Sequence, residues 1–136
     1  MSPTIEVHIE VKVEGTWHHY SAPFFHDIRV FGMMGCTRFT KNHAPVVECK
    51  GLSDLGPLTD LTHYCRKRHE PDAFDASWLS SAECVELHWR MMKELDVDRD
   101  DLYFGYIFDS DIDLARSPGD MAAAGLEDYR MIFWFM

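Results

Sequence analysis

Apolar and polar residues take turns along the start of the sequence, and this alternation restricts the fold more than any other feature. The alternating residues are Ile5, Glu6, Val7, His8, Ile9, Glu10, Val11, Lys12, Val13 and Glu14. Because neighbouring side chains on a β-strand point to opposite faces, the pattern predicts a strand that buries one face. Gly15 interrupts the pattern and residues 17–20 resume it with aromatic side chains, so we predict a β-hairpin over residues 4–22.

Three helices are expected after the hairpin. Asp27 is a suitable N-cap for a short helix over residues 28–34, and a second short helix is expected over residues 59–68. The longest helix begins with a capping box, in which the Ser80 hydroxyl accepts from the Glu83 amide and the Glu83 carboxylate reaches back. Beyond this cap, apolar residues recur mostly at intervals of three and four and predict one buried face: Cys84, Val85, His88, Met91, Met92 and Leu95.

Two further strands are expected toward the end of the chain, over residues 102–108 and 129–135. This order of elements predicts an α+β fold with an antiparallel sheet, made of the N-terminal hairpin plus two C-terminal strands, and with helices on one face. A length of 136 residues is typical of one domain, so we predict a single compact domain over residues 1–136.

The cellular setting is inferred from what the sequence lacks. The longest apolar run covers residues 131–136, far short of the roughly 20 residues that a membrane-spanning helix needs. The first residues resemble no signal peptide, and the four cysteines form no C-x-x-C pair, which favours reduced thiols. We therefore expect a cytoplasmic protein without a membrane contact.

Negative charge is concentrated late in the chain. The formal net charge is −10, and residues 94–128 hold eleven acidic residues against Arg99 and Arg116. A field of this sign repels nucleic-acid phosphates, so we expect no direct nucleic-acid binding. It attracts basic protein surfaces or metal cations. The simplest interpretation remains a solvated acidic face that keeps the protein soluble.

Metal-ligating residues occur without a complete motif. Asp109, Asp111 and Asp113 resemble the start of a calcium loop, but the glycine and glutamate that such a loop needs are missing. Six zinc-ligand types fall between residues 36 and 69: Cys36, His43, Cys49, His63, Cys65 and His69. Only Cys65 and His69 have the spacing of a zinc-ligand pair. We therefore predict no metal and no cofactor, and because enzyme signatures are absent we name no catalytic residue.

A basic cluster offers an alternative small-molecule site. Its candidate residues are Tyr64, Arg66, Lys67, Arg68, His69 and Trp78. The cations suit a phosphate, and Tyr64 or Trp78 suits stacking on a base. These residues make a nucleotide-binding or nucleotide-cleaving protein the alternative function. Consecutive cations at a helix end are more often a solvated terminus that the helix dipole favours.

Five segments of the chain resemble a family of small accessory proteins of tailed bacteriophages. They are IEVKVEGTWHHYSAP, HDIRVFGMMG, KGLSD, DAFDASWLSSAE and EDYRMIFWF, and they occur in the same order. The resemblance implies a phage protein in the host cell cytoplasm with one intact domain. It implies no particular mechanism.

The function expected first is non-enzymatic binding of a host or phage macromolecule with a basic surface. The residues expected to contact this protein partner are Asp96, Asp98, Asp100, Asp101, Asp109, Asp111 and Asp113. A protein that normally holds nucleic acid is a natural target, since carboxylates can occupy its phosphate-binding groove and inhibit it. A structural virion component is a third hypothesis. The sequence leaves the oligomeric state and the identity of the partner open.

Overall fold

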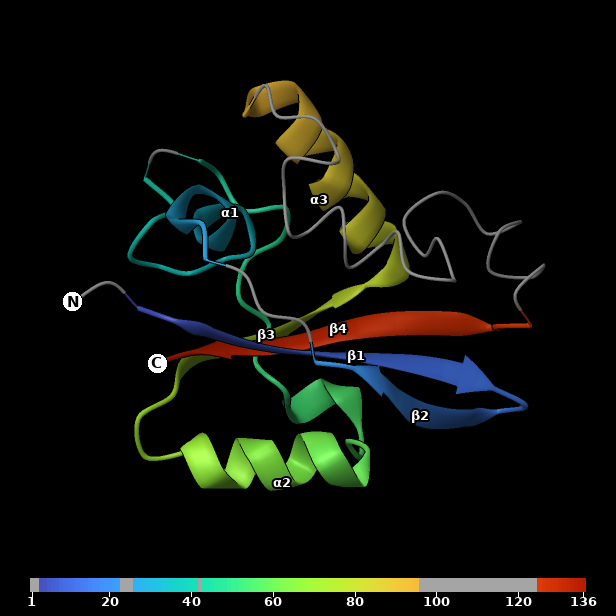
Figure 1. The fold of residues 1–136 in the computed structure, drawn as a ribbon. Helices are drawn as coiled ribbons and strands as arrows, with labels where there is room; N and C mark the ends of the chain where they lie inside the picture. The colour runs from blue at the N-terminus through green and yellow to red at the C-terminus, as the bar shows by residue number, and fades with distance from the viewer. Residues whose placement is uncertain (1–2, 23–25, 42, 96–124) are drawn as a thin grey trace.

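A four-stranded antiparallel sheet lies at the centre of the computed structural model, which describes residues 3–22, 26–41, 43–95 and 125–136 (Figure 1). Its order is β2, β1, β4, β3. The strands are β1 (Ile5–Val13), β2 (Thr16–Ser21), β3 (Phe74–Ser80) and β4 (Asp128–Phe135). The central pair, β1 and β4, joins the two ends of the chain, and Thr4 and Met136 exchange backbone hydrogen bonds of 3.1 and 3.0 Å beside it.

The predicted N-terminal hairpin is confirmed. β1 and β2 pair antiparallel, and the turn between them is Glu14–Gly15. Both turn residues have positive φ, 50° for Glu14 and 78° for Gly15. A two-residue turn of this kind matches the right-handed twist of the strands on either side of it.

The expected α+β class is confirmed, whereas the strand order and the placement of the helices differ in detail. α1 (Ile28–Met33) and α3 (Ser81–Glu94) lie on one face of the sheet, and α2 (Asp60–His69) lies on the other (Figure 1). Residues 131–135 of β4 are apolar and buried on both faces of the sheet, and such a run needs a layer on each face. None of the helices in the described ranges is long and apolar enough to cross a membrane.

Sequence alone had not predicted β3. The sequence patterns assign no strand or helix to residues 74–79, most of the stretch that β3 occupies, and β3 pairs with β4. The strand predicted over residues 102–108 lies outside the described residues.

The capping box predicted at the start of α3 is present. The Glu83 backbone N–H donates to Ser80 Oγ at 3.2 Å, and the Ser80 backbone N–H donates to Glu83 Oε1 at 2.8 Å. Asp27 caps α1 as expected, since its side chain accepts from the Arg29 backbone N–H.

The apolar core lies between the sheet and the α1 and α3 layer. One side of β1 and β4 contributes most of its strand residues: Ile5, Val7, Ile9, Val11, Tyr129, Met131, Phe133 and Phe135. Helix α1 packs so closely against the segment that follows it that a Cβ at Gly32 would collide with the backbone of Phe39. A glycine is therefore required within this helix despite its cost in helix propensity.

Candidate metal centre

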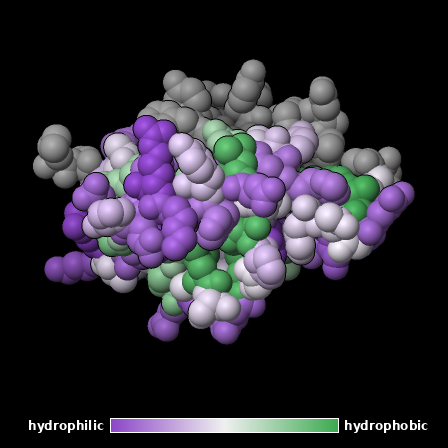
Figure 2. All heavy atoms as spheres, turned by 90° about the horizontal axis from the view of Figure 1, so that it is seen from below, coloured by the Kyte–Doolittle hydropathy of each residue, from purple (hydrophilic) through white to green (hydrophobic). Residues whose placement is uncertain are grey.

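Helix α2 presents polar side chains to the sheet. Thr62, Cys65, Arg66 and His69 recur at helical spacing and are buried or partly buried, whereas Leu61, Tyr64, Lys67 and Arg68 are exposed. Seen from the α2 side, the surface is mostly hydrophilic, with apolar residues in separate patches (Figure 2). The layer under α2 therefore differs in kind from the apolar core across the sheet.

The N-terminal end of α2 is fixed to the sheet through a buried carboxylate. The Thr59 backbone N–H and hydroxyl donate to Glu10 Oε2 at 2.9 and 2.6 Å. The other oxygen of Glu10 accepts from Arg130 at 2.8 and 2.7 Å, and the guanidinium also donates to backbone oxygens of Leu55 and Pro57. Burial alone would raise the pKa of Glu10, but these hydrogen bonds outweigh it and leave the pKa below its usual value.

The C-terminal end of α2 is fixed through Trp134, a fully buried residue of β4. The Trp134 indole N–H donates to His69 Nδ1 at 3.3 Å. The Arg66 guanidinium carbon lies 5.7 Å from the centre of the same ring, and His8 stacks on the ring at 5.4 Å. Residues 66 and 69 are therefore held against Trp134 of β4.

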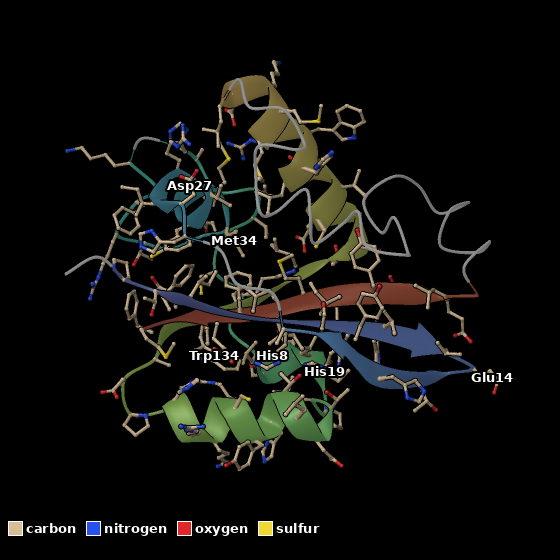
Figure 3. The ribbon with its side chains drawn as sticks, in the orientation of Figure 1. His8, Glu14, His19, Asp27, Met34 and Trp134 are labelled. Atoms are coloured by element: carbon tan, nitrogen blue, oxygen red, sulfur yellow. The ribbon has the colours of Figure 1, made fainter. Side chains whose placement is uncertain are left out.

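A chain of three side chains runs along the sheet beneath α2. His8 Nε2 lies 3.1 Å from Glu6 Oε1, and His8 Nδ1 lies 2.9 Å from His19 Nε2. Figure 3 shows His8, His19 and Trp134 between the sheet and α2. The His8 side chain is 1% exposed, and burial lowers its pKa against the opposing effect of the Glu6 carboxylate. His8 is therefore held as a neutral imidazole with both ring nitrogens engaged.

Cys65 completes a cluster with Glu6 and His8. One ligand atom from each of these residues lies within 4.8 Å of the other two. Glu6 and His8 are two positions apart on β1 and so share a face, and Cys65 approaches that face from α2. The sheet and the helix thus bring a carboxylate oxygen, an imidazole nitrogen and a sulfur to one point.

The electrostatics of this cluster favour metal ligation over nucleophilic catalysis. A catalytic cysteine needs a lowered pKa, whereas burial, assisted by the Glu6 charge, raises the pKa of the Cys65 thiol. A metal ion removes the thiol proton itself and needs a neutral imidazole, which is the form that burial of His8 favours.

The six residues of the predicted small-molecule site do not gather in one place. Arg66 and His69 lie at Trp134, whereas Tyr64, Lys67 and Arg68 are exposed on α2. Trp78 lies on β3, where the Lys50 ammonium stands 3.6 Å from the centre of its ring. The arrangement joins part of the basic cluster to the metal-ligand cluster.

Sequence reasoning had identified Cys65 as a zinc-ligand type but had missed Glu6 and His8 as its neighbours. The signal that existed was the alternation along β1, which places residues 6, 8 and 10 on one face. On β2 the adjacent side chains of His18 and His19 face opposite ways, and of these two only His19 bonds to His8. Which helix covers that face could not be derived from local patterns.

The acidic residues expected to contact a partner lie outside the described residues. They are Asp96, Asp98, Asp100, Asp101, Asp109, Asp111 and Asp113. Binding of a basic partner therefore stays a prediction from the charge pattern.

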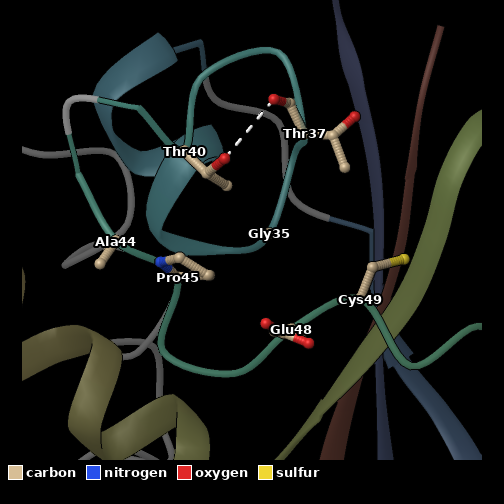
Figure 4. Close-up of a pocket in the computed structure, with 7 residues that line it drawn as sticks. All are labelled: Gly35, Thr37, Thr40, Ala44, Pro45, Glu48 and Cys49. Carbon is tan, nitrogen blue, oxygen red and sulfur yellow. Dashed lines mark hydrogen bonds between the residues drawn. The ribbon is translucent and has the colours of Figure 1, made fainter.

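A separate pocket of about 440 Å³ opens on the α1 side of the molecule (Figure 4). Its lining residues are Gly35, Thr37, Thr40, Ala44, Pro45, Glu48 and Cys49. Glu48 and Cys49 are both exposed, so the charged group and the thiol of this pocket are solvated. The cluster under α2, with its buried His8, is the more specific arrangement.

Comparison with protein-family models, with curated proteins and with solved structures finds no match to this chain.

Proposed function

We propose that this protein binds a divalent transition-metal ion, with zinc as the first candidate, through Glu6, His8 and Cys65. The observation that supports the proposal is the convergence of carboxylate, imidazole and thiol within 4.8 Å around a histidine that is 1% exposed. Zinc takes nitrogen, sulfur and oxygen ligands of these types.

The distances suit one ion after a small contraction. Zinc bonds at about 2.0 to 2.3 Å, so the ligand atoms of a tetrahedral site lie roughly 3.3 to 3.8 Å apart. The ligand atoms farthest apart therefore need to approach each other by about 1 to 1.5 Å, whereas Glu6 Oε1 and His8 Nε2, which are 3.1 Å apart, already have about the required separation. Glu6 and Cys65 are only partly buried, so their side chains have room to adjust.

Three protein ligands leave one coordination position for another molecule. Structural zinc sites use four protein ligands, whereas sites that act on a substrate keep a position for water or substrate. The cluster therefore fits a centre that receives a ligand better than one that only stabilises the fold.

His19 is suited to support the metal ligand His8. When Nε2 of His8 faces a metal, its proton resides on Nδ1, which then donates to His19 Nε2 at the observed separation of 2.9 Å. A metal-bound histidine usually donates its second N–H to such a partner, which fixes the ring and its tautomer.

Titration of the metal-free protein with Co²⁺ tests the proposal, because cobalt replaces zinc and a bound thiolate produces a charge-transfer band in the near ultraviolet. We expect one equivalent of Co²⁺ to produce this band in the wild type, and Cys65→Ser to abolish it. Cys49→Ser is the matched control, since Cys49 is an exposed thiol outside the cluster and its loss should leave the band unchanged.

Two results would overturn the proposal. One is a wild-type protein that binds no Co²⁺ or Zn²⁺. The other is a thiolate band that survives in Cys65→Ser. Far-ultraviolet circular dichroism of each variant distinguishes a lost ligand from a lost fold, and Glu6→Gln should weaken binding without changing that spectrum.

A further inference from the structure

Arg66 has a buried nitrogen without a hydrogen-bond partner. In the part of the chain that the structure describes, the buried side-chain polar atoms in this condition are Arg66 Nη1 and Trp78 Nε1. Lys67, the residue after Arg66 on α2, differs from it: the Lys67 ammonium is exposed and lies 3.9 Å from the Glu70 carboxylate. An unsatisfied buried donor costs about 1 to 3 kcal/mol, and more when it is charged.

Arg66 and the metal-ligand cluster share a neighbour, the ring of Trp134. Arg66 follows Cys65 on α2 and stands over the ring of Trp134. The same ring stacks on His8, and Trp134 is the cross-strand partner of Glu6. His8 and the Arg66 guanidinium therefore contact the same indole ring, and Glu6 lies beside that ring's residue in the sheet.

The charges around this ring favour an anion once a metal is bound. The carboxylate of Glu6 and the thiolate of Cys65 together cancel the charge of a divalent ion. The guanidinium then leaves the centre with a net positive charge. A guanidinium also presents paired N–H groups that match two oxygens of a carboxylate or phosphate.

We propose that the metal centre takes a small oxyanion as its ligand, with one oxygen in the open coordination position and another on Arg66 Nη1. This inference rests on the proposed metal binding and adds the chemical class of the ligand. A carboxylate and a phosphate both present a pair of oxygens to such a site. Inorganic phosphate and acetate, used as separate probes, distinguish these two classes of ligand.

The test uses the Co²⁺-loaded protein, whose visible d–d bands report a change in cobalt ligands. We expect phosphate or acetate to shift these bands saturably in the wild type, and the probe with the lower dissociation constant identifies the preferred source. Arg66→Met should weaken that binding at least tenfold while the thiolate charge-transfer band remains. Lys67→Met is the matched control, because it removes the same charge from the adjacent exposed position and should change the affinity less than twofold.

Four outcomes decide the matter. Metal binding with no response to either probe overturns the oxyanion inference and leaves the metal proposal intact. Equal losses in Arg66→Met and Lys67→Met also overturn it, since they indicate a general charge effect. A protein that binds no metal overturns both proposals. Partial recovery in Arg66→Lys, with the charge but not the forked geometry restored, supports the specific contact.

Discussion

The two faces of the sheet are built from the same strands and differ in chemistry. On β4, Phe133 faces the apolar core under α1 and α3, whereas its neighbour Trp134 faces α2 and touches two histidines and an arginine. On β1, the face opposite the core carries Glu6, His8 and Glu10. One face is therefore organised by burial of apolar area, and the other by hydrogen bonds between buried polar groups.

The two faces also differ in what they contribute: the apolar face stabilises the fold, and the polar face fixes the position of α2. Apolar burial supplies the main favourable free energy of folding. A buried ion pair such as Glu10 with Arg130 costs desolvation free energy that offsets much of its attraction, so it is weak evidence for net stability. The pair does fix the position of α2, because both Thr59 and the carbonyl groups of residues 55 and 57 bind to it. Precise placement of α2 is what the metal-ligand cluster requires.

The largest effect is expected on the apolar face. Phe133 is fully buried, and Phe133→Ala should lower the free energy of unfolding by about 3 to 5 kcal/mol, through lost apolar contact and a residual cavity. Urea unfolding monitored by circular dichroism measures this loss. Ile28→Ala, at a residue 42% exposed, should cost no more than about 0.5 kcal/mol. Similar losses in both variants would contradict the placement of the core.

On the polar face, removing one partner of the buried pair should cost more than removing both. Glu10→Ala leaves Arg130 charged and buried, so we expect a loss of about 3 kcal/mol in the free energy of unfolding. In Glu10→Ala combined with Arg130→Met, the loss should be smaller than in Glu10→Ala alone, as a double-mutant cycle by urea unfolding will show. Strictly additive losses would mean that the two side chains do not interact.

Sequence patterns predicted the local elements well, because their causes are local. Alternation predicted β1. The N-cap Asp27 and the capping box of Ser80 and Glu83 predicted where α1 and α3 begin. Strand β3 was missed because only seven residues separate its start from α3, and its irregular pairing near residue 75 breaks any regular pattern. A strand of this kind is defined by its pairing with β4.

The candidate metal centre could not be predicted for a related reason. Glu6 and Cys65 are far apart in sequence, and their proximity depends on which face of the sheet α2 covers. The burial of β4 on both sides requires a layer on each face, but it does not say which helix supplies it. The position of α2 on the sheet, which places residue 65 near residues 6 and 8, is set by the contacts of Thr59 and His69 at the two ends of the helix.

A smaller effect tests whether the polar face positions the metal. His19→Phe keeps a ring in place but removes the partner of His8 Nδ1, so affinity for Zn²⁺ should fall about 10- to 100-fold. That loss corresponds to about 1.4 to 2.7 kcal/mol. Competition between the protein and a chromophoric chelator measures it. His18→Phe is the matched control, because His18 is an exposed residue whose side chain points to the opposite face of the same strand, and equal affinity losses in the two variants would show that His19 has no specific part.

The smallest effect concerns a polar contact on the otherwise apolar side. Burial alone would raise the pKa of Glu83, but hydrogen bonds from Lys50 and from the Ser80 backbone outweigh it and lower the pKa. A lowered folded-state pKa means that the carboxylate contributes stability above its ordinary pKa and loses it as the pH falls through the folded-state value. Glutamine at this position keeps the capping box but cannot pair with the Lys50 ammonium.

We therefore expect Glu83→Gln to be less stable than the wild type by about 1 kcal/mol at neutral pH, and the difference to vanish in acid, below the folded-state pKa. Unfolding curves at a series of pH values measure the gap, and Glu86→Gln, at an exposed residue of α3, should show almost none. A gap that persists unchanged in acid would assign the loss to the shape of the cap instead of the charge. In that case the Lys50–Glu83 contact would contribute no charge-dependent stability to the α3 side, and its contrast with the buried Glu10–Arg130 pair on the α2 face would be sharper than these contacts indicate.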